Sequence, residues 1–402
     1  MRAVTQKDLF AKNVDKFLKS FRNIIDLDIQ RGIRLDFVIE KSKTDKLVPI
    51  LKIASPEDAG EIVEICKNTY EGTYPYKEFE DESQIREMIN SNNYNFILFK
   101  DELNNNLGCF MCNLNFKEKK GYMGAFMVKK EYQGKIDIVK SIMGSYIWMW
   151  NTYKNSIALW YCENRTAHAT AQYITSVCGI RTVAILPNKD IFFFKVESDV
   201  LGVIYSEDTL RKMRKKDFPK IIPEISNCFQ YSNNKFDLGP IEFNNQNIDL
   251  NKNQLDKSRS DFEKSSQVNR IGYEQIKFSF KDSDSYFQFI YTPWLKNIEK
   301  TEYKVKNLEE LAIFIEELQK ITKKLDIRYI EVYVSAYEPL QQKIFYESGL
   351  SPRGYVPCWK YNPELGVFED YIVFNHYKGE IKNIILLPEG LELLEALNLN
   401  IG

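Results

Sequence analysis

The chain has 402 residues, which exceeds the roughly 250 to 300 residues that one hydrophobic core usually serves, so we expect two domains. Its composition is 44% hydrophobic and 28% charged, which excludes a disordered or fibrous protein. The 55 Lys and Arg residues nearly balance the 56 Asp and Glu residues, and a net charge of -1 gives no field to attract nucleic acid or an anionic membrane.

The cysteines and the hydropathy bear on the cellular compartment. Seven cysteines, an odd number, lie mostly in apolar runs, which is typical of reduced core residues. The single CxxC, Cys109 and Cys112, falls in a strand-like segment that directs the two side chains to opposite faces, and with two histidines in the chain we predict no metal. No apolar stretch reaches the roughly 20 residues that span a bilayer, and the N-terminus has no signal-peptide organisation. We therefore predict a cytoplasmic protein with no membrane partner.

The N-terminal third of the chain predicts an amphipathic extension followed by a mixed α+β unit. Apolar residues recur at helical spacing over 8–30, within a helical extension that we place at 1–47. A strand over 48–53 then leads into a helix opened by a capping hydroxyl and a first-turn proline, and a second helix is expected near 83–89. Three strands follow as an antiparallel meander, at Tyr94–Lys100, Leu107–Phe116 and Gly121–Val128.

The third of these strands leads into a loop containing Gly134 and then into a helix from Ile138. Strand, glycine-containing loop and helix in this order can bind an anion, because the free amides of the helix N-terminus point into the loop. A strand over 156–162 and a helix over 167–178, with Gly179 as its C-cap, come next. A strand pair near 181–185 and 190–196 completes the unit.

The remaining chain predicts a connection and a second domain. Residues 225–270 are rich in Asn, Ser, Lys and Asp, which is typical of a polar linker. Further on, we predict strands at 274–280 and 286–291, a helix from 308 to 325, a strand at 329–334, a helix at 340–348, and strands around 355 and at 371–374. The order strand, helix, glycine, strand occurs in both parts, which is consistent with an internal duplication. The predicted domains are therefore 48–205 and 271–402, with a helical connection and polar linker over 206–270.

Three segments carry a family resemblance: Ala54-Ser55-Pro56-Glu57-Asp58, Gly124–Val128 with the loop Glu131-Tyr132-Gln133-Gly134-Lys135, and Glu163-Asn164. Together they resemble the GNAT superfamily of N-acetyltransferases, over about 48–197 well and over about 270–380 in part. The resemblance implies an α+β fold with two GNAT-like domains, each a mixed, mostly antiparallel sheet flanked by helices. Because the second domain lacks the glycine loop, we interpret it as a degenerate, structural copy.

The resemblance also implies a reaction. Acetyl-CoA, or another acyl-CoA, would be the co-substrate, and the acyl group would pass to an amine of a small molecule, amino acid or peptide by direct attack in a ternary complex. The implied cofactor-binding residues are Phe126, Met127, Val128, Gln133, Gly134, Lys135, Ile136 and Asn164. Family loops usually carry further glycines where this chain has Ile136 and Ile138, so its backbone approaches phosphates less freely.

Two side chains are candidates for proton transfer. In the family, a tyrosine on the helix after the fifth strand commonly protonates the leaving thiolate, and Tyr173 is the tyrosine on that helix. It lies six residues before Gly179, however, whereas the usual offset of four falls on Thr175. Tyr173 is therefore either catalytic or a packing residue. His168 either relays a proton at the start of the same helix or makes a cap or surface hydrogen bond.

Two clusters near residue 75 are candidates for the acceptor site. The acidic run that contains Glu80 would attract a cationic amine, but the same carboxylates also suit the cap and first turn of the following helix. The aromatic cluster around Tyr74 forms either an acceptor wall or core. We select Tyr74 and Glu80 as candidate substrate-binding residues, and the sequence is compatible with a homodimer.

Two other functions stay open. One is a catalytically inactive acyl-CoA-binding sensor or scaffold, which the missing glycines and the offset of Tyr173 favour. The other is an aminoacyl-tRNA-dependent transferase with paired GNAT-like domains, which the near-neutral charge and the family-like loop disfavour.

Overall fold

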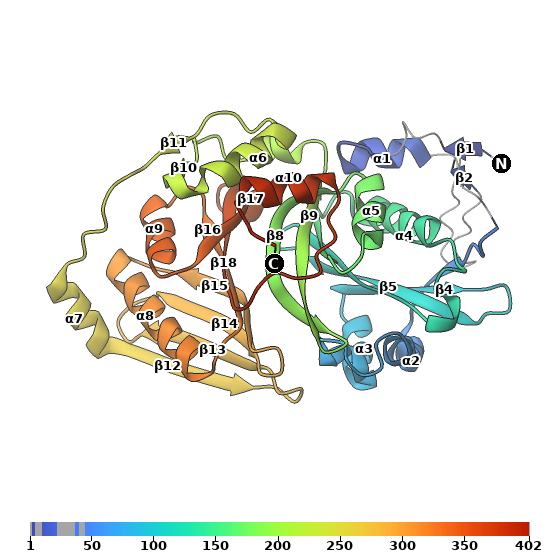
Figure 1. Ribbon diagram of the computed structural model, residues 1–402, viewed down its shortest axis with the longest axis horizontal. Helices are drawn as coiled ribbons and strands as arrows, with labels where there is room; N and C mark the ends of the chain where they lie inside the picture. The colour runs from blue at the N-terminus through green and yellow to red at the C-terminus, as the bar shows by residue number, and fades with distance from the viewer. Residues whose placement is uncertain (1, 5–9, 22–36, 40–44, 402) are drawn as a thin grey trace.

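The computed structural model describes residues 2–4, 10–21, 37–39 and 45–401. Its main feature is one sheet of 14 strands flanked by helices, which confirms the predicted α+β class (Figure 1). The strands of the first half are β3 (Ile50–Ile53), β4 (Tyr94–Lys100), β5 (Asn106–Asn115), β6 (Lys120–Val128), β7 (Leu159–Arg165), β8 (Arg181–Phe192) and β9 (Lys195–Tyr205). Those of the second half are β12 (Phe262–Val268), β13 (Glu274–Phe280), β14 (Tyr286–Thr292), β15 (Asn297–Lys304), β16 (Tyr329–Ser335), β17 (Ser351–Asn362) and β18 (Val367–Tyr377).

The helices and the short strands surround this sheet. The α-helices are α1 (Val14–Phe21), α2 (Ala59–Tyr70), α3 (Glu82–Asn90), α4 (Ile138–Tyr153), α5 (Thr170–Val177), α6 (Ser226–Phe236), α7 (Lys252–Asp261), α8 (Leu308–Lys324), α9 (Pro339–Glu347) and α10 (Pro388–Ala396). The short pairs are β1 (Arg2–Val4) with β2 (Phe37–Ile39), and β10 (Lys220–Ile221) with β11 (Glu242–Phe243). No helix among the described residues is both long and apolar enough to cross a bilayer.

The two halves have the same connectivity. The order β3-β4-β5-β6-β7-β9-β8 matches β12-β13-β14-β15-β16-β18-β17 strand for strand. In both, the fourth and fifth strands are parallel and the other neighbours are antiparallel. The halves meet edge to edge at β8 and β17, where Gly354 pairs with Ala184, so one continuous sheet runs through the molecule.

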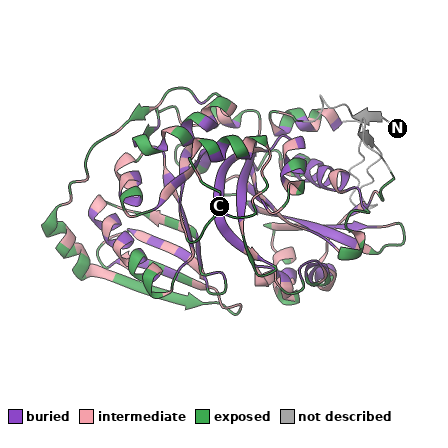
Figure 2. Ribbon diagram, viewed as in Figure 1, coloured by how far each residue is buried: buried purple, intermediate pink, exposed green. Residues whose placement is uncertain are grey.

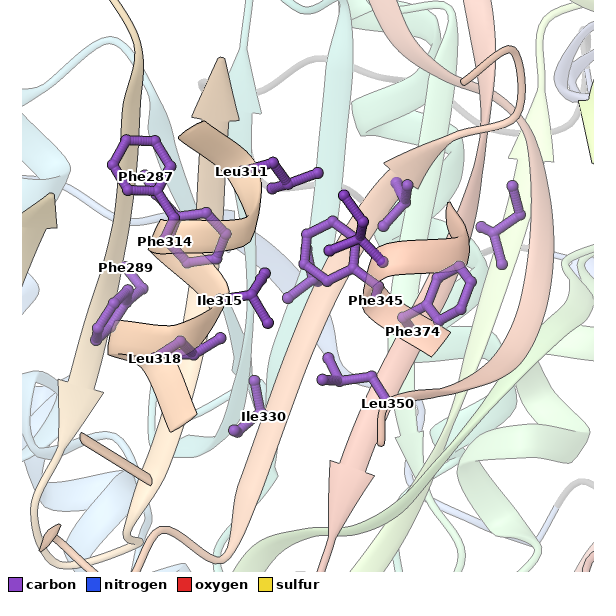
Figure 3. Close-up of a cluster of buried hydrophobic side chains, with 14 of the residues drawn as sticks. Phe287, Phe289, Leu311, Phe314, Ile315, Leu318, Ile330, Phe345, Leu350 and Phe374 are labelled. Atoms are coloured by element: carbon purple, nitrogen blue, oxygen red, sulfur yellow. The ribbon is translucent and has the colours of Figure 1, made fainter. Parts of the chain in front are cut away.

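The halves differ in how helices cover the sheet. In the first half, α1, α4 and α5 pack on one face and α2 and α3 on the other, so apolar cores form on both sides. In the second half, α8 and α9 cover one face, where Phe287 and Phe314 lie in the core (Figure 3). Between β3 and β4 the chain forms α2 and α3, whereas residues 269–273 alone connect β12 to β13. The second face therefore stays polar, since Gln275 and Lys277 on β13 are exposed. The neighbouring edge strand β12 is exposed along most of its length (Figure 2).

Most predicted elements are present, with three corrections. The predicted linker over 225–270 contains α6, α7 and β12, because amphipathic and edge elements also have polar compositions. The hairpin of β8 and β9 turns at Phe193 and Phe194, so the strand predicted over 190–196 crosses the turn; both residues have positive φ values. Strand β15 and helix α10 were not predicted. Of the helix predicted over 8–30, α1 occupies 14–21, residues 10–13 are not helical, and residues 8, 9 and 22–30 lie outside the described residues.

Candidate functional site

A cavity of about 630 Å³ lies between the two halves, and we call it the central cavity. It is bounded by β6 and β7 of the first half, β15 and β16 of the second half, and the segment before α3. Its charged lining residues are Glu78, Glu118, Glu163, Glu299, Glu302, Glu331, Glu338 and Glu369 with Lys120, Lys189, Lys300, Lys304 and Lys360. Its aromatic lining residues are Tyr74, Tyr76, Phe79, Tyr94, Tyr122, Tyr161, Tyr303, Tyr333, Trp359 and Tyr371. Acidic groups outnumber basic ones, and aromatic rings form much of the wall.

The cavity sits where parallel strands separate in each half. In the first half, pairing of β6 with β7 ends at Tyr122 and Tyr161, and a bulge follows at Ala125, which has a positive φ of 47°. In the second half, pairing of β15 with β16 ends at Ile298 and Ile330, and the matching bulge follows. A bulge increases local twist and so separates neighbouring strands. We call these two points the first and second forks.

The forks bring three carboxylates around one buried ammonium. Glu299 and Glu331 are the residues that directly follow the second fork, and Glu163 lies just beyond the first. Lys189 Nζ is 2.8 Å from Glu163 Oε1, 3.0 Å from Glu331 Oε2 and 3.5 Å from Glu299 Oε1. The side chain of Lys189 is 3% exposed, so this ion cluster is screened little by water. It joins groups from both halves of the chain.

The cluster has perturbed proton affinities. Desolvation, together with the neighbouring carboxylates, raises the pKa of Glu299 to about 8. Desolvation also raises the pKa of Glu163, although the Lys189 ammonium opposes the effect. For Lys189, desolvation alone would lower the pKa, but the Glu163 and Glu331 carboxylates hold it well above its ordinary value. Three carboxylates facing one ammonium therefore retain a proton near neutral pH unless another cation joins them.

An aromatic stack lines the cavity beside this cluster. Tyr333 stacks on Trp359 with ring centroids 4.5 Å apart and an interplanar angle of 11°. Tyr161 meets the same indole edge to face at 4.9 Å. Lys120 Nζ lies 4.4 Å from the centre of the Trp359 ring and 3.7 Å from Glu118 Oε2. The protein thus already places one of its own ammonium groups against this wall, as in a cation–π contact.

Contacts between the halves close the cavity beside the segment before α3. The indole nitrogen of Trp294 donates to the carbonyl of Pro75 at 2.8 Å. The Tyr273 hydroxyl accepts from the backbone nitrogen of Lys77 at 3.0 Å and donates to the carboxylate of Glu78. Tyr273 of the β12–β13 turn and Trp294 of the β14–β15 turn therefore hold a loop of the first half in place.

The structure separates the two predicted acceptor residues. Tyr74 lines the central cavity and also packs on Tyr70 with ring centroids 4.6 Å apart, so it is both wall and core. Glu80 forms an ion pair with Lys77 at 3.0 Å, and Glu78 lines the cavity in the same acidic run. Asp81 accepts from the backbone of Gln84 as the N-cap of α3, so part of this run has the capping role.

The predicted phosphate loop has most of its amides bonded within the protein. The amides of Gln133, Lys135 and Ile136 donate to carbonyls of the preceding turn. The amide of Asp137 donates to the Leu47 carbonyl at 2.7 Å, and Ile136 is 1% exposed. The Asp137 carboxylate accepts from the Lys140 amide at 3.1 Å and caps α4, so negative charge already occupies the helix N-terminus. The amides of Gln133, Lys135, Ile136 and Asp137 are therefore engaged within the protein in this structure.

The remaining predicted site residues do not line the central cavity. The amide of Asn164 donates to Thr175 Oγ1 at 3.0 Å and joins β7 to α5. Phe126 packs beneath α4, and Met127 and Val128 are buried on β6. Tyr173 on α5 is 51% exposed. Helix α5 begins at Thr170, so His168 precedes it, and desolvation with the nearby Arg165 lowers the pKa of its imidazole.

The residues that sequence reasoning missed are charged side chains inside strands. Lys189 and Glu299 have ordinary charged neighbours in the sequence, so their burial leaves no local signal. Glu331 does stand in the apolar run of β16, which is a sign of a buried, paired charge. Its partner Lys189 lies 142 residues away, and the pairing depends on the junction of the two halves.

Comparisons with known proteins give similarity in three dimensions alone. No protein-family model matches the sequence, and no curated protein matches it significantly. A mutant form of the spermidine N-acetyltransferase SpeG from Vibrio cholerae is 14% identical over 39% of this chain and 94% of that chain, with a TM-score of 0.34. A dodecameric spermidine N-acetyltransferase from the same organism is 16% identical over 39% and 94% of the chains, with a TM-score of 0.33.

Proposed function

We propose that the protein is an N-acyltransferase of the GNAT type that transfers an acyl group, most simply acetyl from acetyl-CoA, to an amine bound in the central cavity. One observation carries this proposal. The first fork opens between β6 and β7 beside a cavity whose wall combines buried carboxylates with aromatic rings. Carboxylates and π faces both attract ammonium groups, so this cavity suits an amine acceptor.

The proposal assigns roles on both sides of the first fork. Beyond Tyr122, the backbone of Phe126 to Val128 has diverged from β7, and this supports its use by the acyl donor and by a developing oxyanion. Glu163 faces the cavity and its pKa is raised by desolvation, which suits a base that removes a proton from the acceptor ammonium. Tyr173 and His168 remain candidate proton donors to the thiolate on the α5 side.

A second candidate function has its own observation. The bonded amides of the loop over 133–137 and the Asp137 carboxylate favour a catalytically inactive protein that binds an amine and no acyl donor. For the enzyme, the contact of Leu47 with Lys135 and Asp137 must open when the donor binds. The paired-domain, tRNA-dependent transferase gains no support from a cavity rich in carboxylates, because they repel a polyphosphate backbone.

The test is donor binding followed by turnover. If acetyl-CoA binds the folded protein, it raises the unfolding temperature. At a hundredfold excess of ligand over Kd, the free energy of unfolding increases by about 2.7 kcal/mol. Thiol release in the presence of an amine mixture should then exceed release without amine, and Glu163→Gln should reduce it by roughly 100-fold or more. Absence of a shift at saturating acetyl-CoA contradicts the transferase and supports the inactive binding protein.

A further inference from the structure

Asp199 is a buried carboxyl group with an unsatisfied oxygen. It lies on β9 and is 3% exposed, and its Oδ1 atom has no hydrogen-bond partner within the described structure. The cation directly across the sheet, Arg165 on β7, bonds instead to Glu197 through Nε and Nη2, at 2.7 and 2.8 Å. Buried polar groups are nearly always hydrogen-bonded, so this carboxyl calls for an explanation.

The strand register places Asp199 beside Glu163. On the paired strands β7 and β9, Glu163 lies directly opposite Leu201, and Asp199 is two residues from Leu201. Residues directly opposite one another, and residues two apart along a strand, lie on the same face of a sheet. Glu163 and Asp199 are therefore diagonal neighbours on one face. Glu163 lines the central cavity and Asp199 is not among its lining residues, so Glu163 is the one that can contact a ligand.

A third carboxyl lies on the same face. Asp190 on β8 pairs with Glu197, which is two residues from Asp199 on β9. Asp190 is 3% exposed, and its two carboxylate oxygens are 3.4 and 3.5 Å from the hydroxyl of Tyr76, which is long for O–H···O hydrogen bonds. We call Glu163, Asp199 and Asp190 the acidic row. Neighbouring buried carboxylates repel one another, which favours retention of a proton in the row.

Desolvation and mutual repulsion raise the proton affinity of the acidic row. Desolvation, followed by the Glu163 carboxylate, raises the pKa of Asp199 to about 7. Desolvation also raises the pKa of Asp190, and the Asp199 carboxylate adds to this rise. A group that titrates near neutral pH can both accept and release a proton there. The charged groups that face Asp199 are Glu163 and Arg165 on β7, Lys189 and Asp190 on β8, and Glu197 on β9.

We propose that Asp199 accepts the proton that Glu163 removes from the acceptor ammonium, so that Glu163 becomes a base again. In the first step an N–H bond of the ammonium breaks and an O–H bond forms on Glu163. In the second step this O–H bond breaks and an O–H bond forms on Asp199, so a proton alone moves and the row loses one negative charge. The inference rests on the proposed function. Asp199 touches no substrate and acts through Glu163, so it is a positioning residue.

Titration of the purified full chain without acyl donor tests whether the two carboxyls share a proton. With carbon-13 in the aspartate side chains, NMR follows the Asp199 carboxyl, and the spectrum of Asp199→Asn assigns its signal. We expect a midpoint near pH 7, and Glu163→Gln should lower it by roughly 1 pH unit because a neighbouring negative charge is removed. Asp208→Asn, at a 57% exposed side chain, is the matched control and should leave the midpoint unchanged.

Two outcomes of this titration overturn the inference. One is a midpoint below about pH 5 in the wild type, which places no proton on Asp199 near neutral pH. The other is a midpoint that Glu163→Gln leaves unchanged, which shows that the two groups are not coupled. Should Glu163→Gln fail to fold, the wild-type midpoint alone decides the matter.

Thiol release from acetyl-CoA in the presence of an amine mixture gives a second readout. Asp199→Asn should lower kcat by roughly 10-fold, leave KM for the most active amine unchanged, and remove the ionisation near pH 7 from the kcat profile. Asp199→Glu retains a proton acceptor and should restore most of the activity, whereas a purely structural role predicts no such rescue. Identical pH profiles for wild type and Asp199→Asn contradict the inference. A coupled titration without any thiol release refutes the proposed function and leaves the shared proton standing.

Discussion

The two halves of the molecule have the same strand order, but helices cover one sheet face in the first half and leave the matching face of the second half uncovered. In the first half, α2 and α3 cover that face and build an apolar core beneath them. In the second half, a five-residue turn over 269–273 replaces both helices, and the same face stays open. The central cavity lies between this uncovered face of the second half and the first-half segment before α3. The cavity therefore lies where the second half lacks the helices that cover the matching face of the first half.

The comparison also explains where the charges lie. A strand fork needs a bulge, and each half has one at the same place, at Ala125 and at Lys300. Under helices, the first fork is lined by apolar groups such as Met127 as well as by Glu163. Without helices, the second fork carries Glu299 and Glu331. Carboxylates are tolerated there because Lys189 of the first half neutralises part of their charge.

Among the substitutions considered, replacement of Lys189 should reduce the free energy of unfolding the most. Lys189→Met leaves three buried carboxylates without their ammonium, and we expect a loss of about 3 to 5 kcal/mol in the free energy of unfolding at neutral pH. Denaturant unfolding measures it. Lys378→Met, which removes a surface ion pair with Asp326, should cost under about 1 kcal/mol. Equal effects of the two substitutions would show that the cluster does not hold the halves together.

The junction of the halves offers the next largest effect. A Cβ on Gly354 would lie 2.2 Å from the Val183 carbonyl oxygen, so Gly354→Ala must push β17 away from β8. We expect a loss of roughly 1 to 3 kcal/mol from this overpacking, seen as a lower unfolding midpoint. In α2, a Cβ on Gly60 makes ordinary contacts at 3.5 Å, so Gly60→Ala should be neutral or slightly stabilising. A midpoint unchanged by Gly354→Ala argues against the close junction.

The pH dependence of stability should sharpen the difference between the forks. Because the folded pKa of Glu299 is raised to about 8, the folded state holds an extra proton above the unfolded pKa, and stability falls as pH rises toward 8. The facing groups are Lys189, Asp190, Glu331 and Glu163. Glu299→Gln mimics the protonated form and should remove part of this slope, with a gain on the order of 1 to 3 kcal/mol at pH 9 relative to pH 5. Parallel pH profiles of variant and wild type would contradict the assignment.

Loss of the contact between Trp294 and the first-half segment over 72–80 should have the smallest effect on stability. Trp294→Phe removes the hydrogen bond to the Pro75 carbonyl and should reduce stability by about 0.5 to 1.5 kcal/mol. It should also speed hydrogen exchange in the segment over 72–80. A change confined to this segment distinguishes local loosening from a general loss of stability. Tyr346→Phe, at a 38% exposed ring on α9, is the comparison. Unchanged hydrogen exchange over 72–80 would mean that the second half does not hold this segment in place.

Local pattern predicted much of the fold and little of the candidate site. Strands β4 and β13 were predicted to the residue, because apolar runs bounded by turn residues specify a strand locally. Strand β15 was missed because its sequence, NIEKTEYK, alternates polar residues on a face that no helix covers. Tyr74 was predicted for the acceptor site and lines the cavity, whereas Lys189 and Glu299 depend on partners distant in the chain.

Short-range chemistry in the chain was sufficient to specify α+β elements, the capped helix starts and the repeat of strand, helix, glycine and strand. Tertiary contacts decide which groups of the glycine loop are free: the Leu47 amide donates to the Lys135 carbonyl, and the Leu47 carbonyl accepts from the Asp137 amide, which the motif alone would leave free. The cavity and its ion cluster were likewise decided by the edge-to-edge joining of two sheets. Charges distant in sequence interact only after such a junction places them within a few ångströms, and no periodicity of residues records that distance.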